Sequence, residues 1–384
     1  MHFDFATATR IIFGPGRVRE AISTATSLGR KALIVSGRTP ARLQPFLEQL
    51  QIQGVGCTPF CLSGEPTIPA VLEGVQIAKN AGCEIVVGYG GGSALDGAKA
   101  IAALMANPGG PLDYLEVVGK GQPLIHASAP CICIPTTAGA GCEVTRNAVL
   151  ISPEHRVKVS LRGPRMFPSL AVVDPELTYS LPRSITASTG MDALCQLIEP
   201  FVSIAANPMT DAICRDGIRR AALWLHAACA DGANVQAREN MSLASLLGGL
   251  ALTNAGLGAV HGLAAPLGGA FPIPHGIVCA RLLPAAIEAN VKALNARATD
   301  SPALVRYNEV ARLLTGAVSA GVRDGVEWLK ALCADLSLPS LSSFGLTERD
   351  LPGIAEKAQK SSSMKPNPIQ LTAEELTDIL HSAL

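Results

Sequence analysis

The segment EIVVGYGGGSALDGAKAIAA, residues 84–103, places an apolar β-branched run directly before Gly90, Gly91, Gly92 and Ser93 and then a helical pattern. This order predicts a strand, a tight turn and a helix in immediate succession. Glycines let backbone N–H groups approach a ligand without Cβ interference, and a helix N-terminus attracts anions. The segment therefore predicts a pyrophosphate-binding loop; a turn that only packs strand against helix is the alternative.

The loop differs from the G-x-G-x-x-G fingerprint and follows the third apparent strand, so the standard Rossmann placement is not expected. A second candidate loop is PTTAGAGCEVT, residues 135–145, which follows another apolar run and offers Thr136 and Thr137. Two such loops would bind one dinucleotide between them.

Short β-branched runs alternate with helical patterns in the first half of the chain. Strands are expected at Lys31–Ser36, Gly54–Cys61, Glu84–Gly88, Cys131–Pro135 and Leu170–Val173, helices at Pro40–Gln53 and Pro69–Ala81, and a hairpin at 144–160. Alternating strands and helices predict a doubly wound, mostly parallel α/β sheet of Rossmann-like type.

After Pro182 the pattern becomes helical throughout. Helical periodicity covers 184–203, 208–230, 237–253 and 301–319. The sequence thus predicts an α/β nucleotide-binding domain over 1–183 and an all-helical domain over 184–384, with a cleft between them.

Composition argues against several classes of partner. Thirty-one Lys and Arg balance 31 Asp and Glu, so no net field attracts nucleic acid or an anionic membrane. The 11 cysteines are scattered rather than paired at zinc-binding spacing, which indicates buried thiols in a reducing compartment. The N-terminus lacks a basic segment followed by a long apolar run, and the uncharged stretch 241–280 is interrupted by glycine, proline and histidine. A cytoplasmic protein is expected.

Three side chains in the helical half suggest a metal site. Asp192 and Gln196 in GMDALCQLIE are four residues apart on one helical face, and His261 and His275 each open a predicted helix in the uncharged stretch. One carboxylate and two imidazoles suffice for a divalent cation with a position left for substrate. Ordinary core histidines are the alternative.

Together these segments make the chain resemble the iron-containing alcohol dehydrogenase family, whose relatives include maleylacetate reductases, glycerol dehydrogenase and dehydroquinate synthase. The matching segments lie in family order across nearly the whole chain: GGGSALDGAK at 90–99, PTTAGAGCEVT at 135–145, VVDPEL at 172–177, GMDAL at 190–194, HGLAAPLGG from 261, HGIVCARLLP from 275 and NPIQLTAEEL at 367–376.

The resemblance implies hydride transfer between NAD(P) and an alcohol or aldehyde, with the residues of the quoted motifs in fixed roles. As cofactor-binding residues it gives Gly91, Gly92, Ser93, Asp96, Thr136, Thr137 and Lys158, of which Lys158 would reach the nicotinamide side. Asp192, His261 and His275 carry over as catalytic metal ligands. The cation would lower the pKa of the alcohol or polarise the aldehyde.

Two positions depart from the family pattern. The family reads G-x-D-A-L-x-H and H-G-x-x-H, where this chain has Gln196 and Ala265 in place of the final histidine of each motif. A glutamine oxygen can ligate a hard cation but is a poorer partner than imidazole for Fe²⁺ or Zn²⁺. Gln196 is kept as a candidate ligand, and a weakly held metal is expected.

A third departure concerns the choice of cofactor. The segment 36–39, SGRT, has no acidic residue where many family members bind the ribose hydroxyls, and Arg38 after Gly37 could attract a 2′-phosphate. We expect NADP to be accepted beside NAD; a solvated surface Arg38 is the alternative.

The leading interpretation is an NAD(P)- and metal-dependent alcohol dehydrogenase or aldehyde reductase acting on a small alcohol or aldehyde. A maleylacetate-type oxo-acid reductase is the near alternative, and Arg146, Arg162 and Arg165 are its candidate acid-binding residues. A dehydroquinate-synthase-like lyase and a non-catalytic nucleotide-binding relative are the alternatives from other classes. A homodimer is expected by analogy with the family.

Overall fold

The computed structural model describes residues 2–38 and 40–384. By its internal contacts the chain divides into an α/β unit, residues 6–137 and 141–179, and a helical unit, residues 2–5, 138–140 and 180–384. Each unit is described by itself.

The α/β unit contains a six-stranded parallel sheet. Its strands are β1 (Ile11–Phe13), β2 (Lys31–Ser36), β3 (Gly56–Cys61), β4 (Ile85–Gly90), β5 (Cys131–Pro135) and β8 (Leu170–Val173), in the spatial order β1-β8-β5-β4-β2-β3. The five strands expected from the sequence are confirmed. β1 was not expected, because three residues carry too little pattern and become a strand only by pairing with β8.

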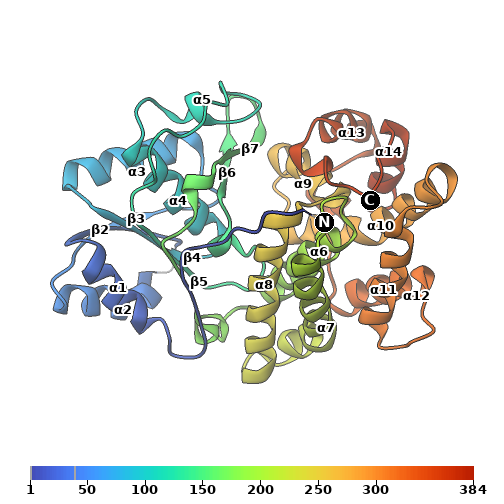
Figure 1. The fold of residues 1–384 in the computed structure, drawn as a ribbon, viewed down its shortest axis with the longest axis horizontal. Coiled ribbons are helices and arrows are strands. Elements are labelled where there is room, and N and C mark those ends of the chain that lie inside the picture. The colour runs from blue at the N-terminus through green and yellow to red at the C-terminus, as the bar shows by residue number, and fades with distance from the viewer. Residues whose placement is uncertain (1, 39) are drawn as a thin grey trace. The chain divides into compact units, whose positions relative to one another are not determined.

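Helices cover both faces of the sheet, as Figure 1 shows with α1 and α2 on one side and α3 on the other. They are α1 (Arg19–Leu28), α2 (Pro40–Ile52), α3 (Ile68–Ala81), α4 (Gly92–Ala106) and the short α5 (Pro111–Tyr114). Successive residues of β2 point to opposite faces: Leu33 packs with α3 and α4, and Ile34 packs with α1 and α2. Burial on both faces explains why these strands are continuously apolar.

The hairpin expected between 144 and 160 is present as β6 (Asn147–Ser152) and β7 (Val157–Arg162), paired antiparallel. It is fixed to α4 by two side chains. The Asp96 carboxylate accepts a hydrogen bond from the Val149 N–H at 3.1 Å, and the Lys99 ammonium lies 3.1 Å from Asp96 and donates to Thr145 Oγ1 at 2.7 Å. Because Lys99 is fully buried, these partners are needed to compensate its charge.

A second buried carboxyl lies near this cluster. Burial raises the pKa of Glu143 to about 7. The positive charge of Lys99 lowers this pKa but only partly offsets the rise. Between the ordinary pKa of a glutamate and about 7, the folded chain binds a proton that the unfolded chain has released. The contribution of Glu143 to the free energy of unfolding therefore falls as pH rises through this window and stays low above it.

We predict that Glu143→Gln abolishes this decline. Relative to the native chain, the variant should gain up to about 3 kcal/mol of stability between mildly acidic and alkaline pH, since each unit of pKa shift is worth about 1.4 kcal/mol. Denaturant unfolding at a series of pH values measures the difference, and Glu154→Gln in the exposed hairpin turn is the control. Parallel pH profiles for Glu143→Gln and the native chain would disprove the prediction.

The helical unit contains nine helices among the described residues. They are α6 (Arg183–Val202), α7 (Pro208–Ala230), α8 (Val235–Ala255), α9 (Ala259–Ala270), α10 (His275–Arg297), α11 (Pro302–Thr315), α12 (Val322–Asp335), α13 (Leu351–Gln359) and α14 (Ala373–His381). α6 is buried along nearly its whole length because it packs against α7, α8 and α10. One hydrophobic cluster runs from α6 to α14.

The four helical patterns expected after Pro182 are confirmed with small shifts at their ends. The run expected to reach 319 stops at Thr315, because Gly316 adopts φ +73° and closes the helix in a left-handed turn. α8, α9 and α10 cover the uncharged stretch apart from residues 256–258 and 271–274, so it is mostly helical, as expected. In the part of the chain that the structure describes, no single helix is both long and apolar enough to span a membrane; α8 and α9 pass that test only as a pair bent by 101°.

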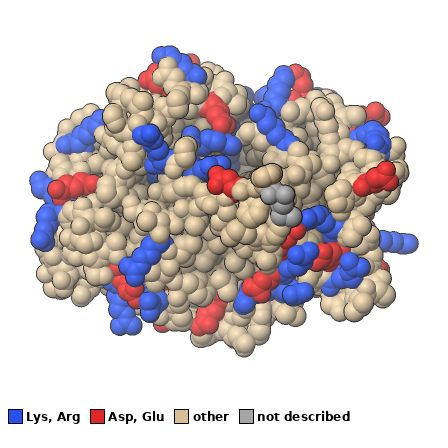
Figure 2. Space-filling view, viewed as in Figure 1, with Lys and Arg blue, Asp and Glu red and all other residues tan. Residues whose placement is uncertain are grey.

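Charged residues of both signs are interspersed over the face shown in Figure 2, and most of that face is uncharged. This distribution agrees with the balance of charges in the sequence.

Candidate functional site

The predicted phosphate loop lies at the carboxyl edge of the parallel sheet. The chain winds from β2 outward to β3, then returns to β4 and continues the other way to β5 and β8, so the winding direction reverses between β2 and β4. In doubly wound sheets, ligands bind outside the carboxyl ends of the strands at this switch point. Gly37 and Arg38 follow β2 here, and Gly91 follows β4 as the N-cap of α4.

The segments at this edge lie close together. A Cβ on Gly90 would stand 3.6 Å from the Gly37 nitrogen and only 2.8 Å from the Ala94 methyl, so α4 can turn back directly only after a glycine. A Cβ on Gly91 would stand 3.4 Å from the Thr137 side chain. The Thr136 N–H donates to the Gly90 carbonyl at 2.9 Å. The structure thus brings the two predicted loops into contact.

Gly92 and Ser93 form the first turn of α4, where backbone N–H groups lack helical partners. Such a helix N-terminus, directly after the end of a strand, suits an anion. The Arg38 side chain is exposed; Thr39, which follows it, lies outside the described residues.

Two other predicted cofactor residues are engaged within the α/β unit. Asp96 binds the hairpin and Lys99, as described above, so it fixes the scaffold beneath the loop. Lys158 on β7 forms an ion pair with Glu65 at 2.6 Å, and its side chain is nearly buried. Two arginines considered for an acidic substrate also have partners: Arg162 pairs with Glu116, and Arg165 donates to the Ile125 carbonyl.

The three predicted metal ligands come together in the helical unit from three different helices. Asp192 lies on α6, His261 in the first turn of α9 and His275 at the first position of α10. The Asp192 Oδ1 atom is 3.4 Å from His261 Nε2 and 3.6 Å from His275 Nε2. The side chains of Asp192 and His261 are each 6% exposed, whereas that of His275 is 35% exposed. The cluster is therefore open on the His275 side.

Close packing of the helices explains why glycine follows each histidine. A Cβ on Gly276 would lie 2.0 Å from the Ser188 carbonyl oxygen of α6, so any larger residue would push α10 away from Asp192. A Cβ on Gly262 would meet the Met364 side chain at 2.6 Å. The first contact holds His275 against α6, and the second packs the His261 turn of α9 against the 3-10 turn Ser362–Met364.

Glu199 orients His261 and was not found from the sequence. Its Oε2 atom lies 2.6 Å from His261 Nδ1, and its Oε1 atom accepts the Val260 N–H at 2.7 Å. A carboxylate at Nδ1 holds a proton there and orients the ring so that Nε2 faces Asp192 and is the atom available to a cation. Glu199 is seven residues after Asp192 on the same face of α6, and this spacing was the signal in the sequence.

Asn367 gives the last matching segment of the sequence a structural role. Its side-chain oxygen accepts the Ala259 N–H at 3.0 Å at the start of α9, and its amide nitrogen donates to Asn290 Oδ1 at 2.7 Å on α10. It therefore ties together the two helices that begin with the histidines.

Gln196 lies beside the cluster with its amide nitrogen toward Asp192. Gln196 Nε2 donates to Asp192 Oδ1 at 3.1 Å, and its Oε1 atom is buried without a hydrogen-bond partner. A Cβ on Gly248 of α8 would stand 3.8 Å from that oxygen, so the oxygen faces α8. Gln196 thus contacts a predicted ligand as a hydrogen-bond donor.

Cys279 is a further member of the cluster that the sequence did not reveal. Its Sγ atom lies 3.5 Å from Asp192 Oδ1, 3.6 Å from His275 Nε2 and 3.8 Å from His261 Nε2. The donor atoms of all four residues lie within 4.8 Å of one another. Cys279 follows His275 by four residues, so both side chains occupy one face of α10.

The electrostatics of the cluster suit a cation. Burial opposes protonation of His261, but Cys279 and Glu199 outweigh it and raise the pKa of His261 well above its usual value. Burial alone would raise the pKa of Cys279, but a hydrogen bond with Cys195 and the two imidazoles lower it well below the usual value. The donor atoms of the cluster therefore favour a positive charge between them. A carboxylate, two imidazoles and a thiol are all ligands of Fe²⁺ or Zn²⁺, so the residues present fit a divalent transition metal.

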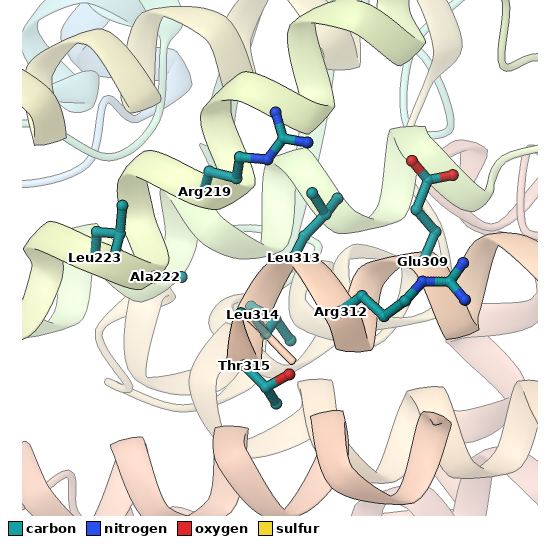
Figure 3. Close-up of a pocket in the computed structure, with 9 residues that line it drawn as sticks. Arg219, Ala222, Leu223, Glu309, Arg312, Leu313, Leu314 and Thr315 are labelled. Atoms are coloured by element: carbon teal, nitrogen blue, oxygen red, sulfur yellow. The ribbon is translucent and has the colours of Figure 1, made fainter. Parts of the chain in front are cut away.

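A separate hollow of about 510 Å³ lies between α7 and α11 in the helical unit. Figure 3 shows Arg219 and Leu223 on one side of it and Arg312, Leu313 and Glu309 on the other. Its Glu309 carboxylate pairs with Arg215 at 2.5 Å, and none of the residues around it belongs to the donor cluster. We assign it no catalytic role.

The comparisons with known proteins all point to the same family. Residues 8–175 match the family model described as iron-containing alcohol dehydrogenase, and residues 186–384 match the model for the C-terminal part of that family. Alcohol dehydrogenase 4 of Saccharomyces cerevisiae is 36% identical over 380 residues, which cover 97% of this chain and 96% of that protein.

Solved structures agree with this result. A crystal structure of 1,3-propanediol oxidoreductase superposes with a TM-score of 0.92 at 32% identity and covers both chains completely. The sulfoacetaldehyde reductase of Bifidobacterium kashiwanohense, solved with NAD⁺, superposes with a TM-score of 0.86 at 30% identity over 100% of this chain and 99% of that one. The chain therefore belongs to the iron-containing alcohol dehydrogenase family and is an NAD(P)-linked, metal-dependent oxidoreductase of alcohols and aldehydes.

Proposed function

We propose that Asp192, His261 and His275 hold the divalent cation and that the reaction is the interconversion of a small primary alcohol and its aldehyde. The observation that carries this proposal is the convergence of the three side chains, from three helices, at 3.4 Å and 3.6 Å around Asp192 Oδ1. A divalent cation held by these ligands supplies the charge that lowers the pKa of an alcohol or polarises an aldehyde carbonyl.

The residues of the chain have distinct tasks in this proposal. Asp192 contributes negative charge, and Glu199 fixes the His261 tautomer so that Nε2 is available as a ligand. Gln196 donates to Asp192 and so limits the orientations of its carboxylate. The exposed side of His275 is the direction from which substrate reaches the cluster.

We further propose that NAD(P) binds at the carboxyl edge of the sheet. The pyrophosphate lies on the first turn of α4 at Gly91, Gly92 and Ser93, with Thr136 and Thr137 beside it and Asp96 and Lys99 supporting the turn from below. Lys158, held by Glu65, lines the nicotinamide side, as the family resemblance suggests. The nicotinamide supplies hydride exchange at the substrate carbon.

In this proposal, the two halves of the chain bind different groups. Residues 1–183 act as the dinucleotide domain and residues 184–384 as the metal and substrate domain, because the loop residues lie in the first range and all the metal donors in the second. We also propose a cytoplasmic homodimer. The 11 cysteines, all within the described residues and all free, support a reducing compartment, and the family resemblance supports the dimer.

The test is steady oxidation of NADH and NADPH with a panel of small aldehydes, before and after the addition of Fe²⁺, Zn²⁺ or Mn²⁺ to chelator-treated protein. The proposal expects sustained, metal-dependent turnover. Catalysis that persists in full after complete metal removal would exclude it.

Cofactor choice is a separate prediction. Arg38 follows β2 at the switch point, where a cation can pair with a 2′-phosphate. We predict that Arg38→Ala raises the KM for NADP about tenfold and leaves the KM for NAD nearly unchanged, because one exposed charge-assisted hydrogen bond is worth roughly 1.5 kcal/mol. Arg19→Ala, in the exposed first turn of α1, is the control. A native chain that strongly favours NAD in kcat/KM would contradict the prediction.

A further inference from the structure

The donor cluster has a fourth member at the distances a metal ligand requires. Around a tetrahedral cation, bonds of about 2.0–2.1 Å to N or O and about 2.3 Å to S place the donor atoms roughly 3.3–3.6 Å apart. The sulfur of Cys279 lies 3.5 Å from Asp192 Oδ1, 3.6 Å from His275 Nε2 and 3.8 Å from His261 Nε2. The thiol thus stands where a fourth ligand would stand.

Gln196, the other candidate for the fourth ligand, does not direct its side-chain oxygen toward Asp192. Gln196 presents its amide nitrogen, which cannot ligate a cation, to Asp192 at 3.1 Å. Its oxygen faces Gly248 of α8 and has no hydrogen-bond partner. Turning the amide over would place that oxygen against the Asp192 carboxylate, where it would lose the hydrogen bond it now donates.

A second thiol near the cluster lacks these contacts. Cys195 Sγ lies 3.8 Å from His261 Nδ1, but that nitrogen is already bound to Glu199 at 2.6 Å. Burial raises the pKa of Cys195 well above its usual value, so this thiol stays protonated. Cys195 is therefore a matched control: it is a buried cysteine that contacts the Nδ1 side of the same histidine and the Cys279 thiol, but it is not one of the four donors around Asp192.

We propose that Cys279 is a ligand of the divalent cation, so that the site consists of Asp192, His261, His275 and Cys279, with Gln196 as a positioning residue that acts through Asp192. This proposal rests on the proposed function, which places the cation at the same site. On cation binding, the proton held between the Cys279 sulfur and the imidazoles is released to the buffer, and Cys279 coordinates as thiolate. A thiolate is a soft ligand, so Zn²⁺ and Fe²⁺ are favoured over Mn²⁺ and Mg²⁺, and the metal is held more firmly than three ligands and a neutral amide would hold it.

X-ray absorption spectroscopy of the full-length chain loaded with Zn²⁺ tests the ligand set without reference to activity. We expect one sulfur scatterer at about 2.3 Å beside N and O scatterers at about 2.0–2.2 Å. Cys279→Ser should lose the sulfur scatterer, and Cys195→Ser should retain it. A native spectrum with N and O scatterers alone, or an unchanged sulfur scatterer in Cys279→Ser, would overturn the proposal.

Metal affinity gives a second measurement. In competition with a chelator, Cys279→Ser should bind Zn²⁺ at least about 100-fold more weakly, since loss of a partner that only orients a ligand already costs 10- to 100-fold. Gln196→Ala should weaken binding less and keep the sulfur scatterer. The double variant Gln196→His, Cys279→Ser should regain affinity with a sulfur-free spectrum, because it restores the imidazole that the family pattern has at that position.

The outcomes separate this proposal from the proposed function. Metal-dependent aldehyde reduction with a sulfur-free native site would refute the Cys279 ligand and leave the function standing. A sulfur-containing site without turnover would support the ligand and refute the function. Failure to bind any of these metals would overturn both.

Discussion

Asp192→Asn is expected to remove both the metal and the activity. The carboxylate is the anionic oxygen from which His261 Nε2 and His275 Nε2 lie 3.4 Å and 3.6 Å away, and its replacement by an amide of the same shape removes that charge without creating a cavity. A bound cation contributes several kcal/mol to transition-state stabilisation, so kcat/KM should fall by at least about 1000-fold, or roughly 4 kcal/mol.

Two controls show whether the loss has this cause. Asp300→Asn, at an exposed position of the helical unit, should keep native metal content and activity. NADPH binding by Asp192→Asn should remain close to native, because the loop that we assign to the dinucleotide belongs to the other unit. A variant that loses its metal yet reduces aldehydes at the native rate would show that Asp192 has no such role.

Gly91→Val is expected to weaken dinucleotide binding strongly and to spare the metal. A Cβ at this N-cap already lies 3.4 Å from the Thr137 side chain, and the two additional methyl groups would crowd the space where the pyrophosphate approaches the first turn of α4. Loss of one or two charge-assisted hydrogen bonds costs roughly 3 kcal/mol, so the Kd of NAD(P)H should rise by about 100-fold.

The measurement is titration of NAD(P)H by its fluorescence, together with metal analysis. Gly110→Val is the matched control, because a Cβ there meets nothing within 4 Å and its backbone is extended. An unchanged Kd in Gly91→Val would exclude this turn as the phosphate site.

Much of the fold could be predicted because the burial of one or both faces of a helix or strand determines where apolar residues occur along it. β2 is apolar throughout since both of its faces are covered, and the helices beside it show periodic apolar residues. β4 extends to Gly90, two residues beyond the expected end, because Gly88 and Gly90 leave room for Leu95 and Ala94 as α4 folds back. Such tertiary contacts cannot be read from local pattern.

The sequence predicted the three metal ligands, but it did not predict all of the residues that surround them. His261 and His275 stood out because polar residues are conspicuous in an uncharged stretch, and Asp192 stood out with Gln196 as a polar pair on one helical face. Glu199 and Cys279 were missed although their spacing from Asp192 and His275 placed them on the same helical faces. The sequence does not state how α6, α9 and α10 cross, and that crossing decides which neighbouring side chains reach the ligands.

In the proposed function, the metal cluster activates an alcohol for direct hydride exchange with NAD(P). Reduction of a small aldehyde with NAD(P)H deuterated at C4 tests it most directly, with mass analysis of the product alcohol from metal-loaded and metal-free chains. We predict that the metal-loaded chain transfers deuterium to the carbinol carbon and that the metal-free chain and Asp192→Asn do not. Consumption of the aldehyde without deuterium in the alcohol would exclude direct hydride exchange, and equal transfer without metal would exclude a role for the cation.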